Sequence, residues 1–275
     1  MARAFSASGI LTTLAFLFSS HAAGQATAPA YSATQLNCAR FLETSESKIL
    51  TEAGGRIRRQ TSARRGSWQF RAVPSDTTLS VEAWLDSLTI TRRSEETAIS
   101  PDTDGLLGGR YRGRLSSTGL YITEVHPFVP DEVAEVAGMA TALDDFFPRV
   151  PPRSLRVGEV WADSLGLTIK RLPDSVSSGV TLQRFDLRRR EKSQSAASAR
   201  DTMELEQEST EVGQFVWHPQ RGLLRRQRSI VVETTVPPSR SVRQAVRSRV
   251  EQRLTLLRTS DSRRQTLCGS PARER

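Results

Sequence analysis

The chain lacks the residue patterns that mark familiar catalytic sites. It contains no Gly-x-Ser-x-Gly elbow, zincin motif, phosphate-binding loop or dinucleotide fingerprint. Beyond the first 25 residues it has only two histidines, His126 and His218, and each directly precedes a proline. That position is typical of a strand end or a turn, so we interpret both as polar turn residues. A catalytic triad around either histidine, or a metal site using His126 and Asp131, would rest on unspecific combinations. The sequence therefore predicts no catalytic residues, no cofactor and no metal.

Lysine is also scarce. Lys48, Lys170 and Lys192 are the only three, so arginine carries nearly all of the net charge of +9. The arginine pairs are scattered along the chain, and no nucleic-acid-binding motif accompanies them. We therefore expect a solvated basic surface and no nucleic-acid partner. Attraction to an anionic envelope polymer is the functional alternative.

Long hydrophobic runs are limited to the start of the chain. Arg3 precedes the apolar run 10–18, and small residues follow it. This pattern predicts a secretory signal over residues 1–24, with cleavage between positions 24 and 28. The run is shorter than the ~20 residues that a spanning helix needs, which argues against a membrane anchor. No later stretch is apolar enough to span a bilayer, so we expect an exported protein, periplasmic or extracellular, without a transmembrane segment.

The two cysteines, Cys38 and Cys268, lie near opposite ends of the chain. In an exported protein with two cysteines, a disulfide bond is the default interpretation. It would close a loop of about 230 residues, and such bridges contribute about 2–5 kcal/mol to stability. The alternative is a pair of separately buried thiols. A paired Cys38 also disfavours a cysteine nucleophile.

Alternating residues predict β-structure for most of the chain. In segment 241–256 apolar residues occupy even positions and charged residues odd ones, as in a strand with one wet face. Segments 116–119 and 218–222 each end in glycine and separate two such runs, which indicates hairpins. Further strands are expected at 68–70, 79–90 and 229–236.

One helix is expected over Asp131–Phe147. Its apolar residues recur at helical spacing, acidic residues begin it and Pro148 ends it. Asp144 and Asp145 fit its C-terminal end badly; we interpret them as solvated carboxylates, with a functional site as the alternative. The expected fold class is mainly β: antiparallel, with a strongly curved sheet or open half-barrel and this one packed helix.

A partial repeat suggests two related β-units. Trp84-Leu85-Asp86-Ser87-Leu88 resembles Trp161-Ala162-Asp163-Ser164-Leu165, with the stiff connector Pro148–Arg153 between them. We interpret both copies as strands with Trp and Leu in the core, and sugar binding beside tryptophan as the alternative. After the signal, the expected organisation is an N-terminal segment 25–53, a first unit with the helix 54–147, the connector 148–153, a second unit 154–269 and a disordered tail 270–275.

Segments 180–190 and 202–211 predict an antiparallel hairpin around the polar connection 191–201. Pairing Arg188 with Glu204 and Arg184 with Glu208 brings opposite charges together. The same alignment places Leu187 opposite Leu205 on the other face. The residue numbers of paired positions would then sum to about 392.

The chain is similar to the LolA-like family of bacterial envelope proteins. Pro151-Pro152 leads to Val157-Gly158 and Trp161, and long strands follow, joined by hairpins such as Gly222-Leu223. The resemblance concerns the architecture of residues 54–257. It implies one sheet bent around an apolar groove that holds acyl chains or another hydrophobic partner.

These features favour a non-enzymatic exported protein that binds or scaffolds in the cell envelope. A lipid, another hydrophobic ligand or an anionic envelope polymer is the expected partner. The alternative is a secreted hydrolase with an unrecognised site. An apolar groove under the helix would favour the binding protein, whereas a polar pocket around His126 or His218 would favour the enzyme.

Overall fold

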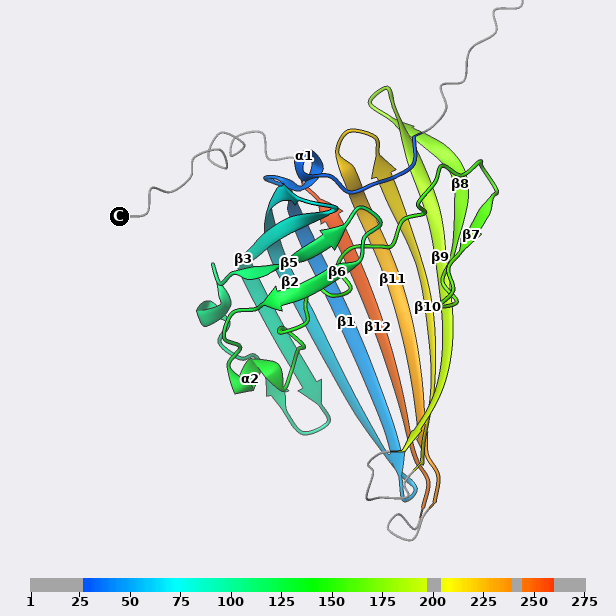
Figure 1. Cartoon of the computed structure of the whole chain (residues 1–275). Coiled ribbons are helices and arrows are strands. Elements are labelled where there is room, and N and C mark those ends of the chain that lie inside the picture. Colours follow the sequence, from blue (N-terminus) through cyan, green and yellow to red (C-terminus); the bar gives the residue numbers. More distant parts are fainter. Residues whose placement is uncertain (1–26, 197–203, 239–243, 260–275) are drawn as a thin grey trace, which may run out of the picture.

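The computed structural model describes residues 27–196, 204–238 and 244–259. The expected signal 1–24, Cys268 and the tail 270–275 lie outside the described residues. Within them, one large antiparallel sheet dominates (Figure 1). The elements in chain order are α1 (Ala33–Leu36), β1 (Arg40–Ala53), β2 (Arg56–Ser75), β3 (Thr78–Ser94), β4 (Ala98–Ile99), the 3-10 helix η1 (Asp104–Leu106), β5 (Tyr111–Ser116), β6 (Tyr121–Val125), α2 (Asp131–Ala134), β7 (Val160–Ala162), β8 (Thr168–Ser177), β9 (Val180–Ala196), β10 (Glu204–His218), β11 (Gly222–Val236) and β12 (Val246–Arg258).

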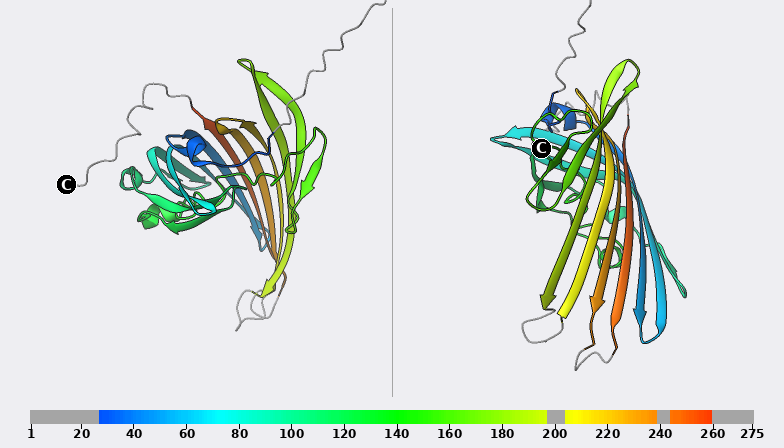
Figure 2. Two further views of the ribbon diagram at one scale, coloured as in Figure 1. Left: turned by 45° about the horizontal axis from the view of Figure 1, so that its top comes forward. Right: turned by 90° about the vertical axis from the view of Figure 1, so that its right-hand side faces the viewer.

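The strand order is β6-β5-β3-β2-β1-β12-β11-β10-β9-β8-β7, with β4 paired to β3. The first and last long strands therefore meet in the middle, where Phe41 lies opposite Arg258 and Ala53 opposite Val246. The sheet is strongly bent and stays open between its edge strands β6 and β7 (Figure 2). The predicted fold class, an antiparallel curved sheet, is confirmed.

The strands expected from residue alternation form where the sequence predicts them. Segments 68–70, 79–90 and 229–236 lie within β2, β3 and β11. The alternating segment is strand β12 from Val246 onward, whereas residues 241–243 lie outside the described part. Both glycine-ended turns join paired strands, β5 to β6 and β10 to β11.

The predicted register of the β9–β10 hairpin is wrong. Arg188 lies opposite Val212, and the paired numbers sum to 400, eight more than expected. Residues 191–196 belong to β9 and not to a loop. The observed register places Phe185 against Phe215, whose stacked rings lie 4.7 Å apart. Because exposed charge pairs contribute only ~0.2–1 kcal/mol, burial of these rings outweighs the charge pattern.

The helix predicted over Asp131–Phe147 is also wrong in its extent. Only α2, Asp131–Ala134, is helical, and a series of turns follows it. Gly138 interrupts the helical pattern, and the Met139 amide donates to the Ala137 carbonyl at 2.7 Å. Phe146 and Phe147 are both buried, and neighbouring helical residues cannot face the same surface. Turns allow both rings to reach the core.

This irregular segment nevertheless covers one face of the sheet, which we call the inner face. Its buried side chains, Val133, Met139, Leu143, Phe146 and Phe147, belong to the main hydrophobic core. On the sheet, that core includes Phe41, Trp68, Phe70, Phe185, Phe215 and Leu256. The ring of Phe146 lies 5.0–6.0 Å from those of Phe41, Trp68 and Phe70. Burial of apolar surface under the covering segment thus stabilises the fold.

The first described residues form a strap across one end of the bent sheet. The Tyr31 amide donates to Ser117 O at 2.9 Å in the β5–β6 turn, and the Tyr31 hydroxyl donates to Pro148 O at 3.1 Å. Near the other edge, Gln183 on β9 donates to Thr27 O at 3.1 Å. The strap therefore connects elements near both edges of the open sheet.

The two copies of the partial repeat do not occupy equivalent places. Trp84-Leu85-Asp86-Ser87-Leu88 lies inside the long strand β3, whereas Trp161 lies in the short edge strand β7 and Asp163 begins the turn to β8. Strands of both units belong to one continuous sheet, joined by β1 of the N-terminal segment, which pairs with β2 and with β12. The division into related β-units stays a prediction.

Candidate binding cavity

A cavity of about 510 Å³ lies between the inner face of the central strands and the covering segment 135–146. This volume falls in the ~300–1,000 Å³ range of small-molecule pockets. Strands β1, β2, β11 and β12 form its floor, with Ile90 contributed by β3. The cavity is therefore built from strands that are distant in sequence and meet only through the β1–β12 pairing.

The lining divides into three chemical kinds. Branched apolar side chains are Ile49, Ile90, Val136, Ile230, Val250 and Leu254. Neutral polar side chains are Ser45, Ser47, Gln60, Ser62, Thr141 and Gln252. Charged side chains include Glu43, Arg64, Asp145 and Arg228. The arrangement suits a ligand that has both apolar and polar parts.

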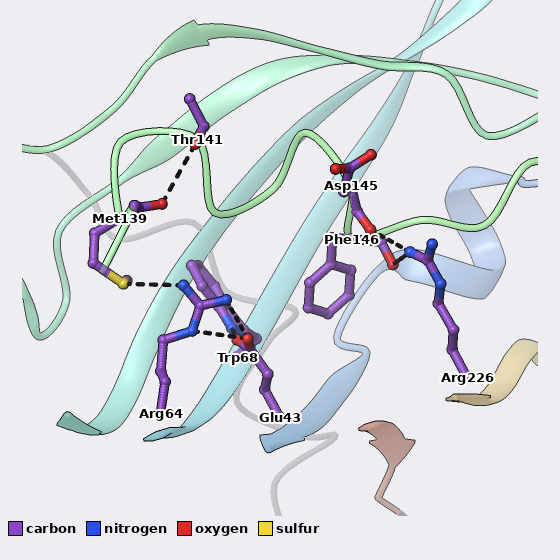
Figure 3. Close-up of polar contacts among 9 residues, drawn as sticks. Glu43, Arg64, Trp68, Met139, Thr141, Asp145, Phe146 and Arg226 are labelled. Carbon is purple, nitrogen blue, oxygen red and sulfur yellow. Dashed lines mark hydrogen bonds and ion pairs between the residues drawn. The ribbon is translucent and has the colours of Figure 1, made fainter. Parts of the chain in front are cut away.

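One wall is formed by Glu43 and Arg64. The Glu43 side chain is 1% exposed; its Oε1 accepts from Arg64 Nε at 2.9 Å and its Oε2 accepts from Trp68 Nε1 at 2.6 Å. Arg64 Nη1 also contacts the Met139 sulfur at 3.4 Å (Figure 3). A buried carboxylate needs such compensation, because desolvation of an unpaired charge is costly. The pair thus fixes both the sheet and the covering segment at this wall.

A second charged group lies on β10 and β11. Arg226 donates to the carbonyl oxygens of Asp145 and Phe146, the latter at 2.9 Å (Figure 3). Burial lowers the pKa of Arg226 to about 10, with a further contribution from nearby Arg228, so the guanidinium stays protonated at neutral pH. Arg226 Nη2 lies 3.6 Å from Glu211 Oε1, which also contacts Arg228 Nε at 2.8 Å.

Arg228 belongs to this charged group and also lines the cavity. Its Nη2 lies 3.2 Å from the Asp145 carboxylate, which is 73% exposed, whereas the Arg228 side chain is 11% exposed. Asp145 was expected to be a solvated carboxylate; the structure places it on the cavity rim as the partner of a nearly buried arginine. Asp144 accepts a hydrogen bond from Thr123 at 2.5 Å and does not line the cavity.

Neither histidine lines the cavity. His218 Nδ1 accepts from the amides of Gln220 and Arg221 at 3.1 and 3.2 Å, within the β10–β11 turn. Desolvation lowers the pKa of His218, and the nearby charges of Arg221 and Arg258 act in the same direction. His126 is exposed and contacts its neighbour Pro127. Within the described residues, no three His, Cys, Asp or Glu side chains are grouped to hold a metal ion.

The structure describes only one of the two cysteines, because Cys268 lies outside the described residues. Cys38 is partly buried just before β1, and its amide donates to Phe70 O at 2.9 Å. Strand β12 ends beside the start of β1, where the Thr259 amide donates to Arg40 O at 3.0 Å. This brings the chain close to Cys38 nine residues before Cys268. The Cys38–Cys268 disulfide stays a prediction.

Three charged residues of the cavity, Glu43, Arg64 and Arg228, were missed by sequence reasoning. Glu43 shares a strand face with Phe41, and Arg64 shares one with Trp68, which was the only local signal. Charged residues on an apolar face are unusual unless they are paired. Their partners come from other strands, and the pairing was not evident before the strand order was known.

Comparison with known proteins leaves the family open. No protein-family model matches the chain, and no curated protein matches it. Among solved structures, the chain is similar to one described as an outer membrane lipoprotein-sorting protein domain from Vibrio parahaemolyticus, over 80% of this chain and 83% of that one. The identity is 6% and the TM-score 0.16, and a likeness at this level carries no argument. The LolA-like resemblance therefore stays a prediction. No helix among the described residues is long and apolar enough to cross a membrane.

Proposed function

We propose that this protein is a non-enzymatic, exported binding protein of the cell envelope that holds a hydrophobic ligand in the cavity under segment 135–146. The observation that carries the proposal is the cavity of about 510 Å³ with half-buried Ile49, Ile230 and Val250 on its floor. Such side chains gain free energy when a ligand removes their surface from water, at ~25 cal/mol per Å². No specific observation favours the alternative hydrolase.

A fluorescence titration with the neutral dye N-phenylnaphthylamine tests the binding site. Ile49→Trp places a larger side chain in the cavity, and we expect it to abolish most of the dye binding seen with the unchanged chain. Leu50→Trp is the matched control, because Leu50 is the next residue of β1 and lies on the opposite face, 37% exposed. Equal dye binding by both variants would reject the cavity as the site.

Two further measurements address the natural ligand and the location. Native mass spectrometry of protein purified without detergent should reveal a retained apolar molecule, which Ile49→Trp should lack. Expression of the full chain in a Gram-negative host should yield a periplasmic product whose first residue lies between positions 24 and 28. A product that keeps its first residues and stays in the cytoplasm would reject export.

A further inference from the structure

Arg228 lies at the boundary between the charged and the apolar parts of the cavity. The nearly buried part of its group holds two guanidinium groups, Arg226 and Arg228, around one carboxylate, Glu211. The second negative charge comes from Asp145, which is mostly exposed. The buried part therefore carries one excess positive charge, and a solvated carboxylate at the rim compensates for it.

Of the two carboxylate contacts of Arg228, the one with Asp145 is the easier for a ligand to replace. Its length is 3.2 Å, compared with 2.8 Å between Arg228 and Glu211. An exposed carboxylate can rotate into water without losing its hydration, so its release costs little. An anion that enters the cavity could take its place, and arginine suits this role because its planar N–H groups match carboxylate and phosphate oxygens.

The apolar floor begins next to Arg228. The next residues of β11 on the same face are Ile230 and Val232, and Val232 pairs with Val250 of β12. Each step of two residues advances about 6.8 Å along a strand. Val250 in turn pairs with Ile49 of β1. A chain that starts at Arg228 can thus extend over branched apolar side chains for several ångströms along the sheet.

We propose that the ligand is a single-chain amphiphile with an anionic head group, a carboxylate or a phosphate monoester. The head group replaces the Asp145 carboxylate at Arg228, and the chain lies over Ile230, Val250 and Ile49. This inference rests on the proposed function, because it specifies the ligand of the same cavity.

Isothermal titration calorimetry with four probes, each built on a linear chain of ten carbons, tests it. The probes are decanoate, decyl phosphate, decanol and decyltrimethylammonium, each below its micellar concentration. We expect both anions to bind about tenfold more tightly than decanol, as a charge-assisted hydrogen bond provides, and the cation to bind most weakly. The ratio between decanoate and decyl phosphate distinguishes a fatty-acid source from a phospholipid-type source.

Two variants examine the role of each charge. Asp145→Asn removes the competing carboxylate, so anion affinity should rise several-fold while decanol affinity stays unchanged. Asp144→Asn removes the neighbouring exposed carboxylate, which does not line the cavity, and should change neither. Arg228→Gln should abolish the preference for anions and preserve decanol binding. Arg228→Gln also removes the contact between Arg228 and Glu211, which can destabilise the fold. Asp145→Asn keeps that contact, so the anion affinity of this variant tests the head-group proposal independently of fold stability.

The outcomes separate the two proposals. Equal affinity for all four probes would leave the apolar site intact and overturn the anionic head group. A decrease in anion affinity in Asp145→Asn would also overturn it. Binding of no probe would overturn the proposed function, and this inference with it.

Discussion

The same long strands behave differently in two regions of the inner face. In the covered region, under the turns of segment 131–150, Phe41, Trp68 and Leu256 are fully buried. Farther along these strands lies the floor of the cavity, which we call the open region because the covering segment does not pack directly onto it; there Ile49 and Val250 remain half-buried. Both regions show the same alternation of inner and outer residues. Alternation therefore decides the face on which a side chain lies, whereas the covering segment decides how deeply it is buried.

Charged pairs show a similar difference between the covered region and the outer face of the sheet. In the covered region Glu43 and Glu211 are enclosed by arginines and by hydrogen bonds. On the outer face, pairs such as Arg190–Glu208 are largely exposed to water. Buried pairs have large effects when one partner is removed, whereas exposed pairs have small ones. Four predictions test this difference, in order of decreasing expected effect on stability.

Removal of the Glu43 carboxylate should have the largest effect. In Glu43→Ala, Arg64 loses its buried partner and the Trp68 Nε1–H loses its acceptor. We expect a loss of about 3–5 kcal/mol in the free energy of unfolding. Urea denaturation followed by tryptophan fluorescence measures it. Glu46→Ala, on the exposed outer face of the same strand, is the control and should change stability little; similar losses in both variants would contradict the comparison.

Truncation at two positions of β12 should separate the regions directly. Leu256→Ala, at a fully buried position, should cost about 2–5 kcal/mol because it leaves a cavity in the core. Val250→Ala, at a half-buried position of the same strand face, should cost about 1 kcal/mol. Thermal unfolding of both variants measures the difference. Equal costs would show that the open region is packed as tightly as the covered one.

The predicted disulfide involves Cys38, which lies just before β1 at the covered end of the sheet. Reduction of Cys38–Cys268 should lower the free energy of unfolding by about 2–4 kcal/mol, because the bond restricts the unfolded chain. Peptide mapping without a reducing agent should recover the two cysteines in one linked peptide pair. Recovery of two alkylated thiols from exported protein would reject the bond.

The smallest effect concerns Glu208 on the outer face. Hydrogen bonds from Arg190 and then Lys192 lower the pKa of Glu208 below its ordinary value. Because the pKa is lowered in the folded state, the associated stabilisation is present above the unfolded pKa and is lost as the pH falls through the folded pKa. Titration by NMR should show the lowered value, and Arg190→Gln should raise it. An unchanged pKa in Arg190→Gln would assign the shift to another cause.

Local sequence patterns predicted some elements of the fold correctly and others wrongly. Alternation in segment 241–256 predicted a strand and its two faces, which β12 forms from Val246 onward, and glycine after polar residues predicted both confirmed hairpins. The register of β9 with β10 could not be read in this way, because Phe215, the stacking partner of Phe185, lies beyond the segment 202–211 whose charges suggested the alignment. The apolar residues of segment 135–147 also recur at helical spacing, yet the segment forms turns. A helix could not bury the neighbouring residues Phe146 and Phe147 on the same face.

Local sequence patterns specify the β-class, the faces of most strands and the two hairpins. These properties depend on neighbours within a few residues, where sterics and alternation act directly. The β1–β12 junction, the cavity and its charged walls depend on tertiary contacts. These contacts join residues that are far apart in the sequence: Ser45 pairs with Leu254 across the junction, and Arg228 contacts Asp145, 83 positions away. Their contact is selected by the burial of the whole sheet, because no local preference distinguishes one distant partner from another.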